Sequence, residues 1–182
     1  TCRFAARGGR LEVLQWLRSQ GCPWDEWTCA YAALKGHLGV LQWAHSQGCP
    51  WDGWTCAYAA SGGYMEILQW ARSQGCPWDI WTYANAATGG HLKVLKWTYS
   101  QGCPLDAYRT YISAARNGQL KVLKWLRSQG CPCDENTCLS AAYNGHLEAL
   151  KWCIENEFPY DLDKLKHMAK DQPSVLEYLE TL

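Results

Sequence analysis

Apolar side chains recur along this chain with the spacing of short amphipathic helices. In one segment Trp27, Ala30, Tyr31 and Leu34 are spaced i, i+3, i+4 and i+7, so a helix would carry all four on one face. Asp25, just before them, is a favourable N-cap. The pattern predicts a helix that begins at this aspartate and runs through an alanine pair, whose small side chains let neighbouring helices approach closely. The pair returns as Ala5-Ala6, Ala32-Ala33, Ala59-Ala60, Ala86-Ala87, Ala114-Ala115 and Ala141-Ala142.

A second apolar stripe follows after a short connection. Leu38, Leu41 and Ala44 lie on one stripe of a helix, and Val40 and Trp43 lie beside it. Helices this short are not stable alone in water, so each must bury its apolar face against other helices. The sequence therefore predicts a helix-turn-helix unit that is stable only when it is stacked on others.

Glycine follows each predicted helix. Gly36 fits the position just past the first helix, where a residue with positive φ ends the helix. Gly48 is predicted to end the second helix, and Pro50 prevents its continuation. The glycines equivalent to Gly36 are Gly9, Gly63, Gly90, Gly118 and Gly145.

The same unit returns along the whole chain with a period of 27 residues. Copies begin near residues 1, 28, 55, 82, 110 and 137, and the one step of 28 has its extra residue near 107–109. A fixed period of this length is typical of stacked repeats. The predicted fold is all-α, an α-solenoid of stacked helix-turn-helix repeats that forms a single domain over residues 1–182. Six of the twelve tryptophans mark the period: Trp16, Trp43, Trp70, Trp97, Trp125 and Trp152.

The two ends of the chain differ from the middle copies. Residues 162–182 place charged residues around a few apolar ones, which is typical of a degenerate C-terminal cap. No cap precedes the first copy, so Phe4, Leu11 and Leu14 would face solvent unless another repeat or another protein covers them. Because the chain begins inside a repeat and without Met, we expect it to be a fragment of a longer protein.

Composition narrows the function classes. The 17 Lys and Arg residues balance the 17 Asp and Glu residues, and no basic stripe of clustered Lys and Arg appears, so nucleic-acid binding is not expected. No apolar run approaches the roughly 18 residues of a membrane helix, so no membrane insertion is expected. No Gly-rich phosphate loop, metal-binding His-Glu pair or nucleophile elbow is present, so neither catalysis nor a cofactor is expected.

Eleven cysteines would by themselves suggest disulfides or metal sites, but their spacing follows the repeat. Equivalent residues of stacked helices lie about 8–10 Å apart, whereas a disulfide needs Cα atoms within roughly 7 Å. We therefore expect buried free thiols in a reducing intracellular compartment, the cytoplasm. The two equivalent sets are Cys22, Cys49, Cys76, Cys103 and Cys131, and Cys2, Cys29, Cys56 and Cys138.

A metal-binding module remains an alternative for the last full copy. Cys131, Cys133, Cys138 and Cys153 could offer four thiolates to Zn²⁺ in a tetrahedron. Their spacing is not the paired C-x₂-C form, and other copies lack the set. The histidines His37, His91 and His146 share one position with Arg10, Tyr64 and Gln119, which favours a hydrogen bond at the helix start over metal ligation.

The repeat resembles a known family. Residues 28–33 (TCAYAA), 36–38 (GHL), 40–41 (VL) and 48–49 (GC) resemble the ankyrin pattern T-P-L-H-x-A-A-x-x-G-H-x-x-V-V-x-x-L-L-x-x-G-A. The ankyrin unit has 33 residues, so each copy here is shorter. The missing residues fall where ankyrins project a β-hairpin, and we expect a tight Cys-Pro-Trp-Asp turn in its place.

The resemblance implies a non-enzymatic scaffold that binds proteins. Positions that vary between copies are expected to face outward and, by analogy with ankyrins, to line the concave face and contact a partner. Within the first helix these are Tyr31, Tyr58, Asn85, Ser113 and Ser140. At its end they are the pairs Leu34-Lys35, Ser61-Gly62, Thr88-Gly89, Arg116-Asn117 and Tyr143-Asn144. On the second helix, Arg18, His45, Arg72, Tyr99 and Arg127 are expected to form a solvated stripe.

The tryptophans divide into two populations. The six that mark the period align with a core leucine of the ankyrin pattern and are expected to form a buried spine. The other six are confined to the first copies, in Pro-Trp-Asp turns and at first-helix starts. They either seal the grooves between repeats in a continuous stack or form an exposed aromatic strip that binds a partner. These six are Trp24, Trp51, Trp78, Trp27, Trp54 and Trp81.

Two functions of different kinds therefore fit the sequence. The first is a protein-binding scaffold or adaptor. The second is a structural or linker subunit of a larger complex, in which a neighbour covers the uncapped first copy. The sequence does not identify a partner for either.

Overall fold

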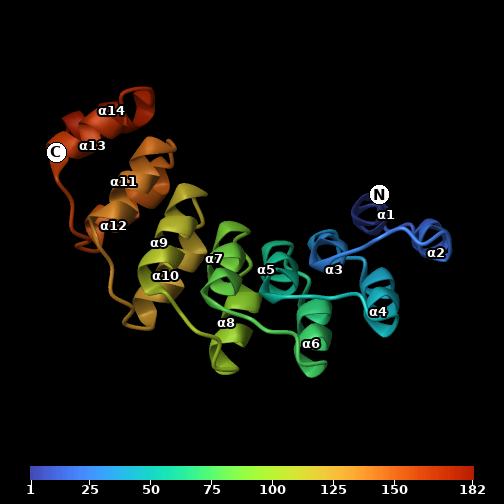
Figure 1. Ribbon diagram of the computed structural model, residues 1–182. Helices are drawn as coiled ribbons and strands as arrows, with labels where there is room; N and C mark the ends of the chain where they lie inside the picture. The colour runs from blue at the N-terminus through green and yellow to red at the C-terminus, as the bar shows by residue number, and fades with distance from the viewer. The chain divides into compact units, whose positions relative to one another are not determined.

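The computed structural model describes residues 1–182, which form fourteen α-helices and no strand (Figure 1). The helices are α1 (Cys2–Arg7), α2 (Leu11–Ser19), α3 (Glu26–Leu34), α4 (Leu38–Ser46), α5 (Gly53–Ser61), α6 (Met65–Ser73), α7 (Ile80–Thr88), α8 (Leu92–Ser100), α9 (Ala107–Arg116), α10 (Leu120–Ser128), α11 (Glu135–Tyr143), α12 (Leu147–Glu155), α13 (Leu162–Met168) and α14 (Pro173–Glu180). Odd-numbered helices are the predicted first helices of each copy, and even-numbered helices are the second.

The helices belong to two compact units. Unit 1 comprises Thr1–Ala86 and Lys93–Pro104, and unit 2 comprises Ala87–Leu92 and Leu105–Leu182. In unit 1 the first helices pack in a row, α1 on α3 and α3 on α5; in unit 2, α9 packs on α11 and α11 on α13. Each first helix also packs on the second helix of its own copy, as α3 does on α4 and α11 on α12. Stacking of helix pairs, as predicted, is thus seen within each unit.

Aspartate precedes the first helices after α1, as predicted, but the Asp25 carboxylate pairs with Arg3 and makes no capping hydrogen bond. The Asp52 carboxylate accepts a hydrogen bond from the Trp54 backbone N–H at 3.0 Å, and the Asp134 carboxylate accepts one from the Asn136 N–H at 3.1 Å. Each bond satisfies an N–H that has no partner within the helix. The connection that leads into α5, residues 47–52, contains no strand, so a short turn stands where ankyrins carry the hairpin.

Glycine ends the helices in the predicted conformation. Gly36 has φ +78° and Gly48 has φ +76°, both in the left-handed region. The close approach at Gly36 adds a second constraint, because a Cβ atom there would lie 2.6 Å from the Tyr64 ring, whereas open space surrounds Gly48. The other predicted first-helix glycines also have positive φ: Gly9, Gly63, Gly90, Gly118 and Gly145.

Hydrogen bonds join consecutive copies at the Gly-His position. His37 Nε2 lies 3.1 Å from the Arg7 carbonyl oxygen, and His146 Nε2 lies 2.9 Å from that of Arg116. These carbonyl groups end the first helix of the preceding copy, where no partner within the helix exists. The predicted hydrogen bond is therefore confirmed for both histidines, and its acceptor is the neighbouring repeat.

The core is made of leucines of the second helices and small residues of the first. The alanine pairs are buried, and six equivalent leucines are fully buried: Leu14, Leu41, Leu68 and Leu95 in unit 1, and Leu123 and Leu150 in unit 2. Tyr83 and Tyr111 are fully buried at the position that is cysteine in four other copies. The expectation that Leu14 faces solvent is wrong, whereas Phe4 is 72% exposed.

The expected buried tryptophan spine is also wrong. Trp16 is 61% exposed, and the five equivalent tryptophans are only half-buried. At 3.6 residues per turn, Trp43 stands about 160° around the helix from Leu41, beyond the edge of the core stripe. The leucine two residues earlier takes the core position in every copy, and the tryptophan lies at the rim.

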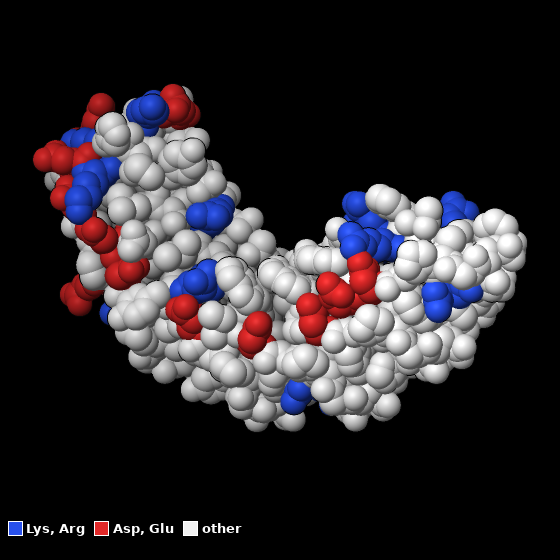
Figure 2. All heavy atoms as spheres, viewed as in Figure 1, with Lys and Arg blue, Asp and Glu red and all other residues white.

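In residues 162–182 the polar side chains are mostly exposed, and several apolar side chains are buried. Leu165, Val175 and Leu179 are fully buried in unit 2. Figure 2 shows acidic and basic side chains gathered over α13 and α14. This distribution is the one expected for a capping repeat.

Candidate functional site

Aromatic rings run along the first helices of unit 1. Trp27, Trp54 and Trp81 stand near the starts of α3, α5 and α7, and their rings stack with centroids 6.2 Å and 5.9 Å apart. Interplanar angles of 26° and 27° make the three rings nearly parallel. Trp81 is 38% exposed, and the other two are half-buried.

A second aromatic row lies one turn further along the same helices. Tyr31 and Tyr58 stack with centroids 6.3 Å apart, and the Tyr58 ring lies 5.5 Å from that of Trp54. We call Trp27, Trp54, Trp81, Tyr31 and Tyr58 the aromatic ladder. Its rings contact one another, as expected for a stack that seals the grooves between repeats. Part of each ring also remains at the surface, as expected for an aromatic strip that binds a partner.

Charged and polar groups border the ladder. The Arg7 guanidinium lies 5.9 Å from the centre of the Tyr31 ring. Asn85 continues the tyrosine row, and its amide donates a hydrogen bond to the Trp81 carbonyl at 2.9 Å. Asp25 pairs with Arg3, and this hydrogen bond is the main reason why the pKa of the Asp25 carboxyl is lowered. Acidic side chains gather beside α3 and α5 in Figure 2.

The remaining predicted contact residues of the first four copies lie near the ends of the first helices. Leu34 and Ser61 are half-buried, and Lys35 is exposed. Thr88 is also exposed, but it belongs to unit 2. Tyr31, Tyr58 and Asn85 are the predicted residues that the structure gathers at the ladder, whereas Leu34, Lys35 and Ser61 lie beyond its tyrosine row.

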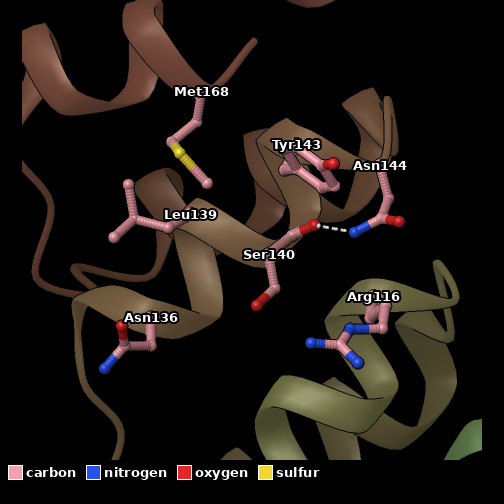
Figure 3. A pocket seen from close by; sticks show the side chains of 7 residues that line it. All are labelled: Arg116, Asn136, Leu139, Ser140, Tyr143, Asn144 and Met168. Carbon is pink, nitrogen blue, oxygen red and sulfur yellow. Dashed lines mark hydrogen bonds between the residues drawn. The ribbon is translucent and has the colours of Figure 1, made fainter.

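Unit 2 carries a hollow of about 470 Å³ on its first helices (Figure 3). Four of the predicted contact residues line it, namely Arg116, Ser140, Tyr143 and Asn144. Ser113, also predicted, does not line it; its carbonyl accepts a hydrogen bond from the Asn117 amide at 2.9 Å. The full lining is Arg116, Asn136, Leu139, Ser140, Tyr143, Asn144 and Met168.

Three residues of the hollow were not predicted. Leu139 occupies the position of Ala30 and Ala57, so a larger apolar side chain in place of alanine was the available signal. Met168 comes from α13 and reaches the hollow only because α13 packs on α11. The third, Asn136, lies in the first turn of α11.

The tryptophans of the Pro-Trp-Asp turns belong to a different surface. Trp24, Trp51 and Trp78 pack edge-on against the second-helix tryptophans of the next copy, with ring centroids 5.7–5.8 Å apart. They therefore do not share one stack with the aromatic ladder. The turn and second-helix tryptophans line two small hollows of about 320 Å³ and 310 Å³ in unit 1.

The second-helix stripe is not uniformly solvated. Arg18 and Arg72 stack over Trp24 and Trp78 at 4.1 Å and 4.2 Å, and the His45 ring lies 3.8 Å from that of Trp51. A cation above an indole ring is attracted by the charge distribution of the ring, which fixes these side chains. The prediction of a solvated stripe is wrong for these three residues. Arg127, although exposed, also donates a hydrogen bond to the Asn156 carbonyl at 3.0 Å and lies 5.4 Å from the centre of the Phe158 ring, whereas Tyr99 is exposed.

The cysteines form neither disulfides nor a metal site. All eleven are free, and no three His, Cys, Asp or Glu side chains lie close enough to hold a metal ion. Cys131 and Cys133 are half-buried, whereas Cys138 and Cys153 are buried. The four thiols of the alternative Zn²⁺ site are therefore not assembled into a tetrahedron.

Neighbouring thiols come from the two different cysteine sets. The interaction of Cys29 with Cys49, together with burial, raises the pKa of the Cys29 thiol. The Cys49 thiol also donates to the Asp25 carbonyl at 3.5 Å. Burial raises the pKa of Cys103 to about 12. These thiols are packed in the core, and Cys49 links its own repeat to the preceding one through the Asp25 carbonyl.

We expect native alkylation to distinguish the buried cysteines from the others. Iodoacetamide at pH 8 should label Cys22, Cys131 and Cys133, which are half-buried, before the eight buried thiols. Intact-mass spectrometry with peptide mapping measures the order, and all eleven should react in urea. Labelling of Cys103 as fast as Cys22 would contradict the packing described above.

Comparison with known proteins bears on the fold. No family model and no curated protein matches the chain. Among solved structures, the ankyrin repeat domain of human ASB11 is similar, with a TM-score of 0.70 and 16% sequence identity over 99% of this chain and 96% of that chain. The protein therefore has the fold of an ankyrin repeat domain. None of its helices is long and apolar enough to cross a membrane.

Proposed function

We propose that this chain is a non-enzymatic scaffold that binds a protein partner through the exposed face of its first helices. The observation that carries the proposal is the aromatic ladder. Tryptophan and tyrosine dominate the energetic centres of protein interfaces because they offer large contact areas with few rotatable bonds. Because the rings already stack on one another, a partner would not have to order them, which lowers the entropic cost of binding.

The sequence supports the same surface independently. Positions that hold the stack, such as the alanine pairs and core leucines, are the same in most copies, whereas ladder positions differ between units 1 and 2. Balanced charge favours a protein over a nucleic acid as the partner. Eleven free cysteines favour a reducing compartment such as the cytoplasm.

The proposal predicts a strong effect of Trp54→Ala on partner binding. Trp54 is central in the ladder, and loss of such a residue typically weakens binding by at least about 30-fold. Proteins captured by the immobilised chain are first identified by quantitative mass spectrometry. Affinity for the enriched protein is then measured by calorimetry.

Trp70→Ala is the matched control, because Trp70 is also half-buried but packs beside Trp51 and His45 on the other surface. It should change the affinity by less than about threefold, the range of a residue outside the interface. Equal affinity of wild type, Trp54→Ala and Tyr58→Ala would refute binding through the ladder.

A structural role within a larger complex is the second candidate function. Three apolar side chains of the first copy favour it, because Phe4, Val13 and Trp16 are 72%, 44% and 61% exposed. Exposed apolar surface of this kind is often covered by another repeat or by a neighbouring chain. Light scattering on the same purified sample separates the two candidates: a free binding module is monomeric, whereas a subunit that lacks its neighbour self-associates.

A further inference from the structure

We infer that the hollow of unit 2 takes a peptide segment of a partner protein in which a carboxylate side chain stands beside an apolar one. The inference rests on the proposed protein-binding function and assigns a ligand chemistry to a second part of that surface. At about 470 Å³ the hollow lies within the range of binding pockets, about 300–1,000 Å³.

The walls of the hollow are fixed by hydrogen bonds between repeats. Arg116 and Tyr143 are the last residues of α9 and α11. His146 Nε2 lies 2.9 Å from the Arg116 carbonyl oxygen, and Gln172 Nε2 donates to the Tyr143 carbonyl at 3.3 Å. The Asn144 amide donates to the Ser140 carbonyl at 2.8 Å, as the dashed line in Figure 3 marks. The backbone around the hollow is therefore held before any ligand arrives.

The polar half of the hollow offers donors to an anion. Arg116 is the single charged residue in the lining, its side chain forms no ion pair within the chain, and no acidic residue lines the hollow. In Figure 3 its guanidinium lies below Ser140. The Ser140 hydroxyl also makes no hydrogen bond within the chain. A guanidinium binds a carboxylate through two parallel hydrogen bonds, so a carboxylate is the complementary group.

The apolar half lies on the opposite side of Ser140. Leu139 and Met168 face one another across the hollow in Figure 3, and the Tyr143 ring, 59% exposed, stands beside them. The same leucine and methionine also line an adjoining hollow of about 340 Å³. An apolar side chain next to the carboxylate would bury its surface here.

The charge and the apolar surface of the hollow exclude other classes of ligand. A nucleic acid or a nucleotide presents several phosphate charges, and a single arginine cannot balance them. A basic peptide would place its charge beside Arg116, and no residue that lines this hollow is acidic. An isolated carboxylate would leave Leu139 and Met168 uncovered. A segment with Asp or Glu close to Leu, Met or Phe satisfies both halves of the hollow.

The test uses a random peptide library displayed on phage and selected on the intact chain. We expect enrichment of an acidic residue next to an apolar one. Fluorescence anisotropy of a selected peptide should give at least about tenfold weaker binding to Arg116→Gln, with an unchanged melting temperature. Replacing Glu by Gln in the peptide should weaken binding to the wild-type chain by the same factor. Combining this peptide with the Arg116→Gln variant should weaken binding no further, because each change removes the same contact.

Three further variants keep the result specific. Lys124→Gln removes one exposed positive charge from the second-helix side of unit 2 and should leave the affinity unchanged. Leu139→Ala installs the residue found in other copies and should weaken binding through the apolar half. Trp54 belongs to unit 1, so Trp54→Ala should leave the affinity for these peptides unchanged.

Each opposing outcome overturns the inference. Enrichment of basic peptides, absence of any enriched peptide, or an equal loss in Lys124→Gln and Arg116→Gln would each do so. Peptides that bind in a Trp54-dependent and Arg116-independent manner would overturn it as well, while the proposed function would stand. Failure of the proposed function is judged separately, from the effect of Trp54→Ala on the captured protein.

Discussion

Leu68→Ala is expected to destabilise unit 1 by about 2–5 kcal/mol, the range for removal of a buried leucine. Leu68 is fully buried on α6, so its loss removes apolar contacts and leaves a cavity between stacked repeats. The far-UV circular dichroism signal during urea unfolding measures the change as a shift of the midpoint.

Trp70→Ala, two residues further on, is the control that makes this result informative. Trp70 is half-buried at the rim and contacts Trp51 and His45. Loss of these ring contacts and of part of the buried area is expected to cost about 1–2 kcal/mol. A larger effect for Trp70 than for Leu68 would restore the tryptophan spine as the core and contradict the burial seen in the structure.

Gly36→Ala is expected to have the second largest effect. Its φ of +78° is unfavourable for alanine by about 1–2 kcal/mol. In addition, the new Cβ would lie 2.6 Å from the Tyr64 ring, and displacing that ring adds about 1–3 kcal/mol. The same urea titration measures the sum.

Gly48→Ala separates the two causes. Gly48 has nearly the same φ, +76°, but open space surrounds it, so only the backbone cost of about 1–2 kcal/mol applies. In a Tyr64→Ala background the difference between the two glycine variants should shrink. If Gly36→Ala and Gly48→Ala were equally destabilising in the wild-type background, contact with Tyr64 would play no part in stability.

The sequence was sufficient to predict features that depend only on residues close together in the chain, such as the ends of the helices. An N-cap acts on the next two or three residues, and a glycine with positive φ acts on its own helix end, so Asp52 and Gly36 revealed helix boundaries directly. The period then implied that identical units stack, and the resemblance implied the ankyrin fold.

The candidate site was predicted only in part. Variation between copies indicated Tyr31, Tyr58 and Arg116, because side chains that do not hold the stack are free to differ. It did not indicate Met168, since that residue reaches the hollow from the following repeat. Nor did it separate Trp24 from Trp27, three residues apart in sequence but on different surfaces.

The sequence by itself determined the helix pairs, their ends, their stacking and the positions free to vary. Only the tertiary structure decided the direction in which each repeated side chain points. A period shows that Trp43 and Trp70 are equivalent, and equivalent residues can be equally buried or equally exposed. Direction depends on which face of the second helix the neighbouring repeats cover. Leu41 and Leu68 occupy that face, and the tryptophans are left at its rim.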